Sequence, residues 1–361
     1  MTDDIALIPD GGISWLDASG PEGNIVLSTR IRLARNLEGK AFPIRADSEA
    51  RLATLDRVVD AARSCGGMGD SAVIRFDAVE PEFCALLHER HLVSKELVSS
   101  GRDGRAPAGA ALVTDGEAGI MVNEEDHLRI QALKSGFALG PAYAAVQALD
   151  GAIGQHLTFA FHHEFGYLTS CPTNAGTGLR ASVLIHLPGL VLTKEIGKVL
   201  QGLSQVGLTF RGLYGEGSEV VGNFFQLSNQ TTLGKSEEEL LDHLGTMVRK
   251  VIEYEEEARH ILQRDAPMVI ADKVWRAYGL LRYARSMSFE EAMNLLSGVR
   301  LGVGLNLISN LSVYTLNKLL VFTQPQHLAQ MEARDVGDPD LNVVRAAYVR
   351  RLLDDDAARM A

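Results

Sequence analysis

The chain has 361 residues, and its 46 acidic and 35 basic side chains give a formal charge of −11. The acidic balance argues against bulk binding to nucleic acid or anionic membranes, and the 46% of hydrophobic residues exclude a largely disordered chain. The sequence contains no run of ~18 apolar residues, the length needed to span a bilayer. It has no basic N-terminal segment of the kind that begins a signal peptide. Cys65, Cys84 and Cys171 form no CxxC pair, so a cytoplasmic protein without a disulfide framework is expected.

The N-terminal third predicts short strands separated by helices. Apolar residues at helical spacing place helices over 48–62 and 81–94. Apolar runs over 24–27 and 72–76 predict strands, and the first strand is expected to enter a polar turn at Ser28-Thr29.

The middle of the chain alternates short apolar runs with turns around one predicted helix, at 140–154. The runs lie at 110–114, 120–123, 157–161, 182–187 and 208–213. This mixture predicts an α+β fold, in which helices flank a mostly antiparallel sheet. His162 and His163 are expected to point to opposite faces of a strand, so no metal site is predicted there.

From Ser236 onward the pattern is helical. Two serines, each three residues before a glutamate, match the capping box that begins a helix: Ser236 with Glu239 and Ser288 with Glu291. Apolar residues at helical spacing follow, and they recur from Asp340 to Leu353. We therefore predict an α+β domain over 1–255 and an all-α domain over 256–361.

Five arginines lie in motif-like stretches. Ser28-Thr29-Arg30-Ile31-Arg32 places two guanidinium groups on one side of an extended segment. The other three are Arg129 in NEEDHLRIQ, Arg180 in CPTNAGTGLRAS and Arg211 in RGLYGEGSE. Five guanidinium groups in one cleft would repel each other unless a polyanion lay between them, and a nucleoside triphosphate with Mg²⁺ fits their planar forks. The alternative is five separate surface arginines. No P-loop, GxGxxG or HExxH motif is present.

Carboxylates form a second group of candidates. Glu124 and Glu125 follow a short apolar run, and Glu216 lies in a glycine-rich turn. Carboxylates facing an arginine cage suggest a guanidinium acceptor, which they would orient and deprotonate as phosphate transfers. A solvated acidic loop is the alternative reading.

Cys171 precedes the glycine-rich stretch Ala175-Gly176-Thr177-Gly178. A covalent nucleophile is disfavoured because no Cys–His pair is evident. A thiolate beside a bound cation and a buried structural cysteine remain as readings.

Four motifs in this order, VLSTRIRLARNL, NEEDHLRIQ, CPTNAGTGLRASV and RGLYGE, closely resemble the phosphagen kinases. TGLRASV and RGLYGE look most like the bacterial protein arginine kinases of that superfamily. The similarity covers about residues 20–250, and the helical tail is also of the kind those relatives carry. It implies ATP with Mg²⁺ and reversible transfer of the γ-phosphate to a guanidino nitrogen.

The resemblance also implies roles for individual residues. Glu125 resembles the catalytic carboxylate, with Glu124 beside it and Glu216 as its partner on a mobile loop, and Cys171 resembles the reactive cysteine near the guanidine. Nucleotide binding is implied for Ser28, Thr29, Arg30, Ile31, Arg32, His91, Arg129, Arg180, Ala181, Ser182, Val183, Leu184, Arg211, Gly212, Leu213, Tyr214 and Gly215. His88 lies near His91 and leaves that one assignment open.

Two features bear on the substrate. Small-guanidine kinases carry a longer segment before the STR motif, whereas 27 residues precede Ser28 here, which favours an uncovered cleft and an arginine presented on a protein. The alternatives are a kinase of free arginine or another small guanidino compound, and a non-catalytic arginine-binding adaptor.

The resemblance further implies marking of proteins for a Clp protease in stress response. A McsA-like zinc-finger activator, a heat-shock repressor and a Clp ATPase are the partners it implies, together with a homodimer formed through the helical domain. The RDxxRA motif of these relatives, which binds phosphoarginine, reads Leu341-Asn342-Val343-Val344-Arg345-Ala346 here, so phosphoarginine sensing is in doubt.

Overall fold

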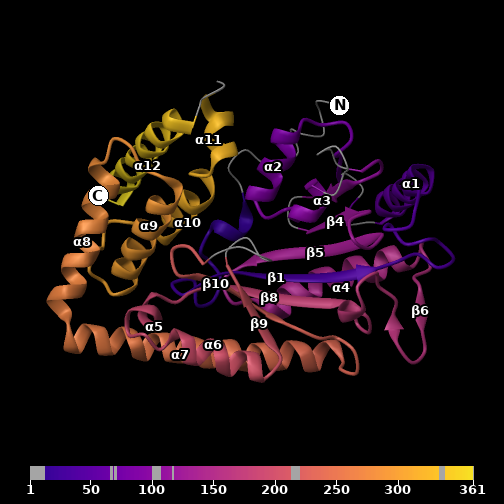
Figure 1. Cartoon of the computed structure of the whole chain (residues 1–361), viewed down its shortest axis with the longest axis horizontal. Coiled ribbons are helices and arrows are strands. Elements are labelled where there is room, and N and C mark those ends of the chain that lie inside the picture. The colour runs from indigo at the N-terminus through magenta and orange to yellow at the C-terminus, as the bar shows by residue number, and fades with distance from the viewer. Residues whose placement is uncertain are drawn as a thin grey trace.

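An antiparallel sheet forms the centre of the molecule (Figure 1). Among the described residues it has eight strands, in the order β2-β3-β4-β5-β1-β8-β10-β9. The computed structural model describes residues 13–65, 68, 71–99, 107–115, 118–212, 220–332 and 338–360. The strands are β1 Val26–Arg35, β2 Ala72–Arg75, β3 Ala111–Thr114, β4 Ala118–Val122, β5 Leu128–Ser135, β8 Leu179–His186, β9 Leu208–Arg211 and β10 Phe224–Asn229. A separate hairpin is formed by β6 Phe161–His162 and β7 Gly166–Tyr167.

Three helices supply most of the apolar side chains that pack against one face of the sheet: α1 Ser48–Ser64, α4 Leu139–Gly154 and α7 Glu237–Asp265. Alternate residues of the central strands, such as Ile31, Ala181 and Val183, are completely buried in this core. The side chains between them point to the other face of the sheet. That face is therefore available for polar residues.

Five helices near the C-terminus gather at one end of the molecule, where α11 lies beside α2 (Figure 1). Their core includes Leu27, Leu184 and Phe224 of the sheet, so the two parts share apolar contacts. The remaining helices are α2 Pro81–Glu89, α3 Lys95–Ser99, α5 Pro188–Leu192, α6 Ile196–Gln205, α8 Pro267–Tyr283, α9 Phe289–Gly304, α10 Val313–Phe322, α11 Pro325–Glu332 and α12 Asp338–Met360, with short 3-10 turns at η2 Ser14–Leu16 and η3 Pro172–Asn174. Of the helices described, none has both the length and the apolar character needed to cross a membrane.

The predicted fold class is confirmed, and so are several individual elements. The helices at 48–62 and 140–154 correspond to α1 and α4. At the start of α7, Ser236 Oγ accepts a hydrogen bond from Glu239 N at 3.1 Å while Glu239 Oε2 accepts one from Ser236 N at 2.7 Å. The division between 255 and 256 stays a prediction, and it falls inside α7.

Three local predictions are wrong. Ser28-Thr29 is not a turn, because β1 pairs with strands on both sides and continues as a strand to Arg35. Residues 157–161 are mostly not strand, since only Phe159 makes an isolated bridge before β6 begins at Phe161. The helix predicted over 81–94 ends at Glu89.

The prediction that His162 and His163 point to opposite faces of a strand is also wrong. The strand ends at His162, so His163 lies in the hairpin turn and the two ring centroids are 4.5 Å apart. Within the described ranges, no three His, Cys, Asp or Glu side chains are grouped as metal ligands.

Candidate active site

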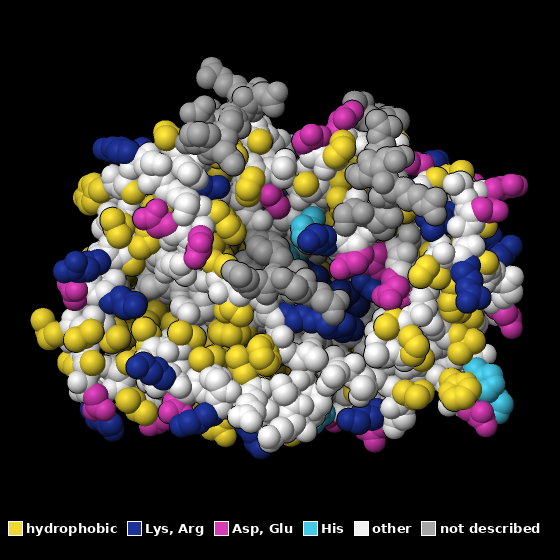
Figure 2. All heavy atoms as spheres, viewed as in Figure 1, with side chains coloured by type: hydrophobic (Ala, Val, Ile, Leu, Met, Phe, Trp, Pro, Cys, Tyr) yellow, Lys and Arg dark blue, Asp and Glu magenta, His cyan; other side chains and the backbone are white. Residues whose placement is uncertain are grey.

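A cleft of about 700 Å³ lies on the polar side of the sheet. In Figure 2, Lys and Arg side chains lie in a hollow near the middle of the molecule, with a histidine beside them and acidic side chains on one rim. All five arginines selected from the sequence line this cleft: Arg30, Arg32, Arg129, Arg180 and Arg211. The volume is in the usual range for a small-molecule site.

The alternation of β1 explains how two of the arginines reach the cleft. Arg30 and Arg32 line it, while Ile31 between them is fully buried in the core on the opposite face. Arg32 lies directly across from Arg180 on β8, and Ala34 lies across from Arg129 on β5. Three neighbouring strands thus bring their guanidinium groups into one wall.

This wall is electrostatically unfavourable without an anion. Burial, and then the charge of Arg129, lower the pKa of Arg30 to about 10. Burial also lowers the pKa of Arg32 far below its usual value, and the neighbouring arginines add to this effect, which Glu124 only partly offsets. Arg32 Nε is buried and has no hydrogen-bond partner among the described residues. A polyanion in the cleft would satisfy this donor and relieve the repulsion.

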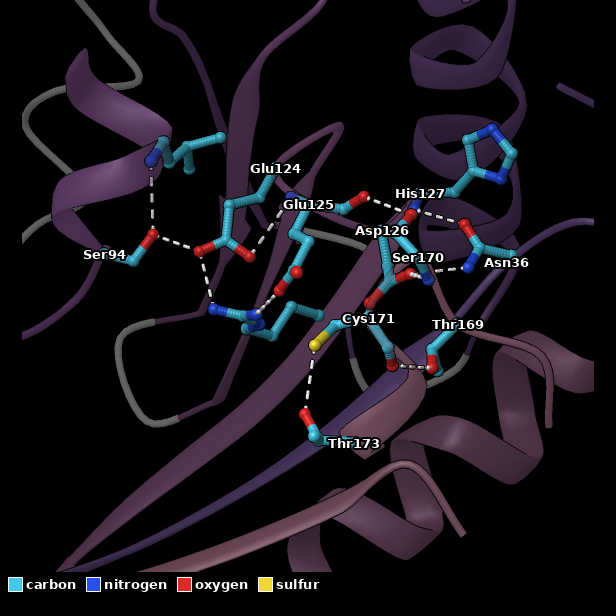
Figure 3. A network of polar contacts seen from close by, with 12 residues as sticks. Asn36, Ser94, Glu124, Glu125, Asp126, His127, Thr169, Ser170, Cys171 and Thr173 are labelled. Carbon is cyan, nitrogen blue, oxygen red and sulfur yellow. Dashed lines mark hydrogen bonds and ion pairs between the residues drawn. The ribbon is translucent and has the colours of Figure 1, made fainter. Parts of the chain in front are cut away.

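Two glutamates face the arginines from the loop between β4 and β5 (Figure 3). Glu124 Oε1 accepts a hydrogen bond from Arg129 Nη1 at 2.6 Å and another from the Ser94 hydroxyl. Glu125 Oε2 lies 3.3 Å from Arg129 Nη2, and the Glu125 side chain is 42% exposed. Glu124 is therefore held within the wall, whereas Glu125 borders the open cleft.

The pKa of Glu125 is raised above that of an ordinary glutamate. Burial is the main cause, and the charges of Asp126, Glu124 and Glu96 add to it, while Arg129 opposes it. Burial by itself lowers the pKa of Arg129, but the same carboxylates outweigh it and the pKa is raised overall. A raised pKa makes Glu125 a stronger base, which suits a proton acceptor.

A buried network fixes the loop that carries these glutamates (Figure 3). Asp126 is fully buried, and its Oδ1 accepts hydrogen bonds from Asn36 Nδ2 at 2.6 Å and Ser170 N at 2.7 Å. The Ser170 hydroxyl donates to the carbonyl of Glu125 at 2.7 Å, and His127 N donates to Asn36 Oδ1 at 2.9 Å. The end of β1, the acidic loop and the segment before Cys171 are joined by these bonds.

Cys171 lines the same cleft as Glu125. Its Sγ lies 3.0 Å from the hydroxyl of Thr173, and it directly follows Ser170 of the buried network (Figure 3). No disulfide is present at Cys171, Cys65 or Cys84, and only Cys171 of the three is not buried. This placement fits a thiol near a bound guanidinium group better than a core cysteine.

His91 and His88 both line the cleft. His91 has a positive φ of 60°, and its ring packs edge-on against Trp15 with 5.4 Å between ring centroids. Burial, together with the charges of Arg30 and His88, lowers its pKa far below the usual value. The ring of His91 is therefore neutral beside the arginines.

Several residues that the resemblance implied for nucleotide binding do not line the cleft, so direct side-chain contact is not supported for them. Ile31, Ala181 and Val183 belong to the core, because they alternate with the cleft residues on their strands. The Thr29 hydroxyl instead donates to Gly136 O at 2.7 Å and accepts from Ala138 N at 3.0 Å. The others outside the lining are Ser28, Ser182, Leu184 and Gly212. Leu213, Tyr214, Gly215 and Glu216 lie outside the described residues.

Reasoning from the sequence alone missed the supporting residues of the site. Asn36 and Asp126 lie inside two of the quoted motifs, and their position beside the chemistry-bearing residues was the available signal. Ser94 holds Glu124 and also accepts a hydrogen bond from Leu97 N at the start of α3, at 3.2 Å. Arg51, Lys95 and other polar cleft residues have no comparable sequence signal.

Comparison with known families agrees with this geometry. Residues 54–258 match the family described as ATP:guanido phosphotransferase, C-terminal catalytic domain, and residues 267–360 match the protein-arginine kinase McsB C-terminal domain. A protein-arginine kinase of Symbiobacterium thermophilum is 46% identical over 343 residues, which cover 94% of this chain and 96% of that protein. The chain belongs to the protein-arginine kinase family. A family member from Bacillus subtilis is 42% identical over 349 residues, covering 96% of this chain and 94% of its own.

Solved structures of this superfamily share the fold. A duplicated taurocyamine kinase from Schistosoma mansoni with bound transition-state analogue components has a TM-score of 0.60 at 29% identity; the match covers 66% of this chain and 34% of that chain. The chain therefore spans about a third of that protein. A lombricine kinase has a TM-score of 0.55 at 26% identity, covering 67% of this chain and 70% of its own. The resemblance to phosphagen kinases and the assignment to guanidino phosphotransferases are confirmed.

Proposed function

We propose that this chain transfers the γ-phosphate of ATP to the guanidino group of arginine side chains in proteins. The observation that carries the proposal is the position of Glu125, a half-exposed carboxylate of raised pKa, on the rim of a cleft whose lining includes all five arginines selected from the sequence. Membership of the family supports the same activity, because the similar members are named protein-arginine kinases.

Each part of the cleft has a role in this reaction. The arginines on β1, β5, β8 and β9 hold the phosphates and neutralise charge that develops on the transferring phosphoryl group. Glu125 accepts a hydrogen bond from the guanidinium acceptor, orients its nitrogen and takes its proton as the N–P bond forms; the bond between the γ-phosphorus and the β,γ-bridging oxygen breaks, and ADP leaves. The thiol of Cys171 lies where a thiolate would stabilise the cationic acceptor.

Mg²⁺ fits this cleft as part of the nucleotide. The described residues offer no cage of three metal-ligating side chains, and Glu124 is already paired with Arg129 and Ser94. Mg²⁺ commonly binds through substrate phosphates and water with few protein ligands. It would supply further neutralisation of the phosphates, while the arginines position them.

The second candidate is a kinase of free arginine or a related small guanidino compound. Nothing in the geometry of Glu125 separates the two acceptors, since both present the same guanidinium group. Incubation with ATP, free arginine and an arginine-bearing protein together separates them. The proposal expects acid-labile phosphate mainly on the protein, and phosphate mainly on free arginine would contradict it.

We propose further that the protein acts in the cytoplasm, in protein quality control with a Clp protease, a zinc-finger activator and a heat-shock repressor. Exposed apolar residues on α8, which include Met268, Val269 and Tyr283, support a homodimer through the helical domain. Arg345 donates to Thr323 O at 2.8 Å and to Met287 O at 2.9 Å, so this arginine of the altered RDxxRA motif makes internal contacts.

A further inference from the structure

One wall of the cleft is built by residues that contact the C-terminal helices. Glu89, the last residue of α2, lies two residues before His91, which lines the cleft. Glu89 is buried against the first turn of α11. This contact links a helical element near the C-terminus to the backbone of the cleft.

The Glu89 carboxylate caps α11. Its Oε1 accepts a hydrogen bond from Gln326 N at 3.0 Å, and its Oε2 accepts one from His327 N at 3.1 Å. Pro325 has no N–H, so Glu89 satisfies the next two backbone donors of this helix. The negative charge also suits the positive end of the helix dipole.

His327 completes the contact through its side chain. Its Nδ1 lies 2.8 Å from Glu89 Oε2, and its Nε2 accepts a hydrogen bond from Arg90 Nε at 3.3 Å. These partners assign the neutral ring with the proton on Nδ1. Burial lowers the pKa of His327, although Glu89 opposes the shift, and this direction agrees with a neutral ring.

A second, apolar contact supports the same wall. The ring of His91 packs edge-on against Trp15. Trp15 belongs to a small core with Val321 and Phe322 of α10, and Phe322 in turn packs edge-on against His327, with 5.0 Å between centroids. The backbone and the ring of His91 are therefore both held through residues of α10 and α11.

We infer that Glu89 and His327 are positioning residues for the nucleotide site, because their contact holds the Glu89–His91 segment, with its positive φ at His91, in the wall of the cleft. The inference rests on the proposed function, in that the cleft takes ATP. The C-terminal helices are then part of what makes nucleotide binding tight. By linkage, nucleotide binding strengthens the contact between α2 and α11 to the same degree.

The test measures equilibrium binding of MgATP to the full chain and the KM values for ATP and for a protein substrate. Glu89→Gln places an amide N–H against backbone donors, and His327→Leu removes the side-chain donor. We expect each to weaken ATP binding and raise the KM for ATP by about tenfold. The KM for the protein substrate should stay within about twofold. His327→Asn, which places an N–H near the position of Nδ1, should restore most of the ATP affinity.

A matched control lies elsewhere in the helical part. Asp356 is also a buried carboxylate that holds the start of a helix: it accepts hydrogen bonds from N of Ser312, the N-cap residue of α10, at 2.7 Å and from the Ser312 hydroxyl at 3.0 Å, and neither residue lines the cleft. Asp356→Asn should leave the KM for ATP unchanged. An equal rise in this variant would show a general effect of destabilisation and would overturn the inference.

A double-mutant cycle tests the route through His91. Glu89→Gln should weaken ATP binding much less in a His91→Ala background than in the parent, because the residue it positions is already gone. Fully additive effects would contradict the inference, as would unchanged ATP affinity in folded Glu89→Gln and His327→Leu variants. A parent chain that binds no ATP would instead contradict the proposed function itself.

Discussion

The chemistry proposed here depends first on the environment of one carboxylate. Glu125 is partly buried beside three other acidic side chains, and among the residues that the structure describes Arg129 opposes the rise in its pKa. Its basicity therefore increases without loss of contact with the cleft. Glu124, one residue earlier, is paired with Arg129 and Ser94 and is placed to organise the wall.

Glu125→Gln tests this assignment. The amide keeps the size of the side chain but cannot accept a proton, so we expect turnover to fall by ~10²-fold or more. ATP binding should remain nearly intact, because Glu125 lies on the acceptor side of the cleft. Steady-state kinetics with a separate binding measurement checks both effects, and turnover within a few-fold of the parent would refute the role.

Arg180→Ala tests the arginine wall. Arg180 lies across from Arg32 on the neighbouring strand, and its guanidinium group is one of the fixed cations of the cleft. We expect weaker nucleotide binding and slower transfer together, with a loss of rate of ~10³-fold. If both ATP affinity and rate are unchanged, the wall does not hold phosphates.

Cys171→Ser distinguishes three roles of the thiol. If Cys171 is a covalent nucleophile, the variant should lose all activity; if it is a structural cysteine, the variant should lose almost none. If it is a thiolate beside a cation, the variant should lose part of its activity. We expect a loss of about one to two orders of magnitude, the worth of one charge-assisted contact. A small anion such as chloride should restore some of the rate. A phosphocysteine detected by mass spectrometry would contradict the electrostatic role.

The sequence predicts the residues that line the cleft better than it predicts the residues that hold them in position. Arg30 and Arg32 could be placed together because side chains alternate along a strand. Asp126 could not be assigned, since its role follows from contacts with Asn36 and Ser170, which are 90 and 44 residues away along the chain. Only the fold brings these side chains together.

At the scale of strands and loops, the loop between β4 and β5 determines where the catalytic glutamate lies. Asn123 begins this loop with a positive φ of 54°, and its amide donates to Arg51 O at 2.8 Å and Gly109 O at 2.9 Å. Gly178 lets the segment that follows Cys171 pack closely against β1, because a Cβ at this position would lie 2.6 Å from Ala34 O. The positions of Glu125 and Cys171 thus depend on close backbone contacts at both segments.

Asp126→Asn separates the charge of this network from its geometry. The Asn oxygen can still accept from Asn36 and Ser170, while the amide nitrogen replaces Oδ2, which has no partner among the described residues. Removing the charge removes one cause of the raised pKa of Glu125. The acid limb of kcat/KM should therefore move to lower pH, because Glu125 stays deprotonated further into acid.

Asp126→Ala serves as the comparison. It removes the acceptor as well as the charge, so we expect a fall in kcat through lost alignment of Glu125 and Cys171. An acid limb that does not move in Asp126→Asn would contradict the electrostatic link between the two carboxylates.

The predictions of helices and strands are correct where local sequence signals agree with the packing of the folded chain. The start of α7 was predictable because its capping box is local. The prediction ended the first strand at Leu27, because the polar residues Ser28 and Thr29 favour a turn. Pairing with β5 and β8 outweighs that local preference, which no window of sequence reveals.

In the molecule as a whole, the sheet and the C-terminal helices share buried contacts close to the cleft. Leu27, Leu184 and Phe224 of the sheet lie in the core of the helical part, and the contact between Glu89 and His327 reaches the cleft wall. The helical character of this part was predictable from its periodicity. Its contacts with the cleft were not, because they join residues more than 230 positions apart.

The central claim is that this cleft phosphorylates arginine in proteins. Mass spectrometry of a protein substrate, incubated with the full chain and MgATP and kept out of acid, tests it most directly. We predict phosphate on guanidino nitrogens of arginine side chains, and none with the Glu125→Gln variant under the same conditions. Phosphate only on hydroxyl side chains, or no phosphate on the protein at all, would contradict the claim.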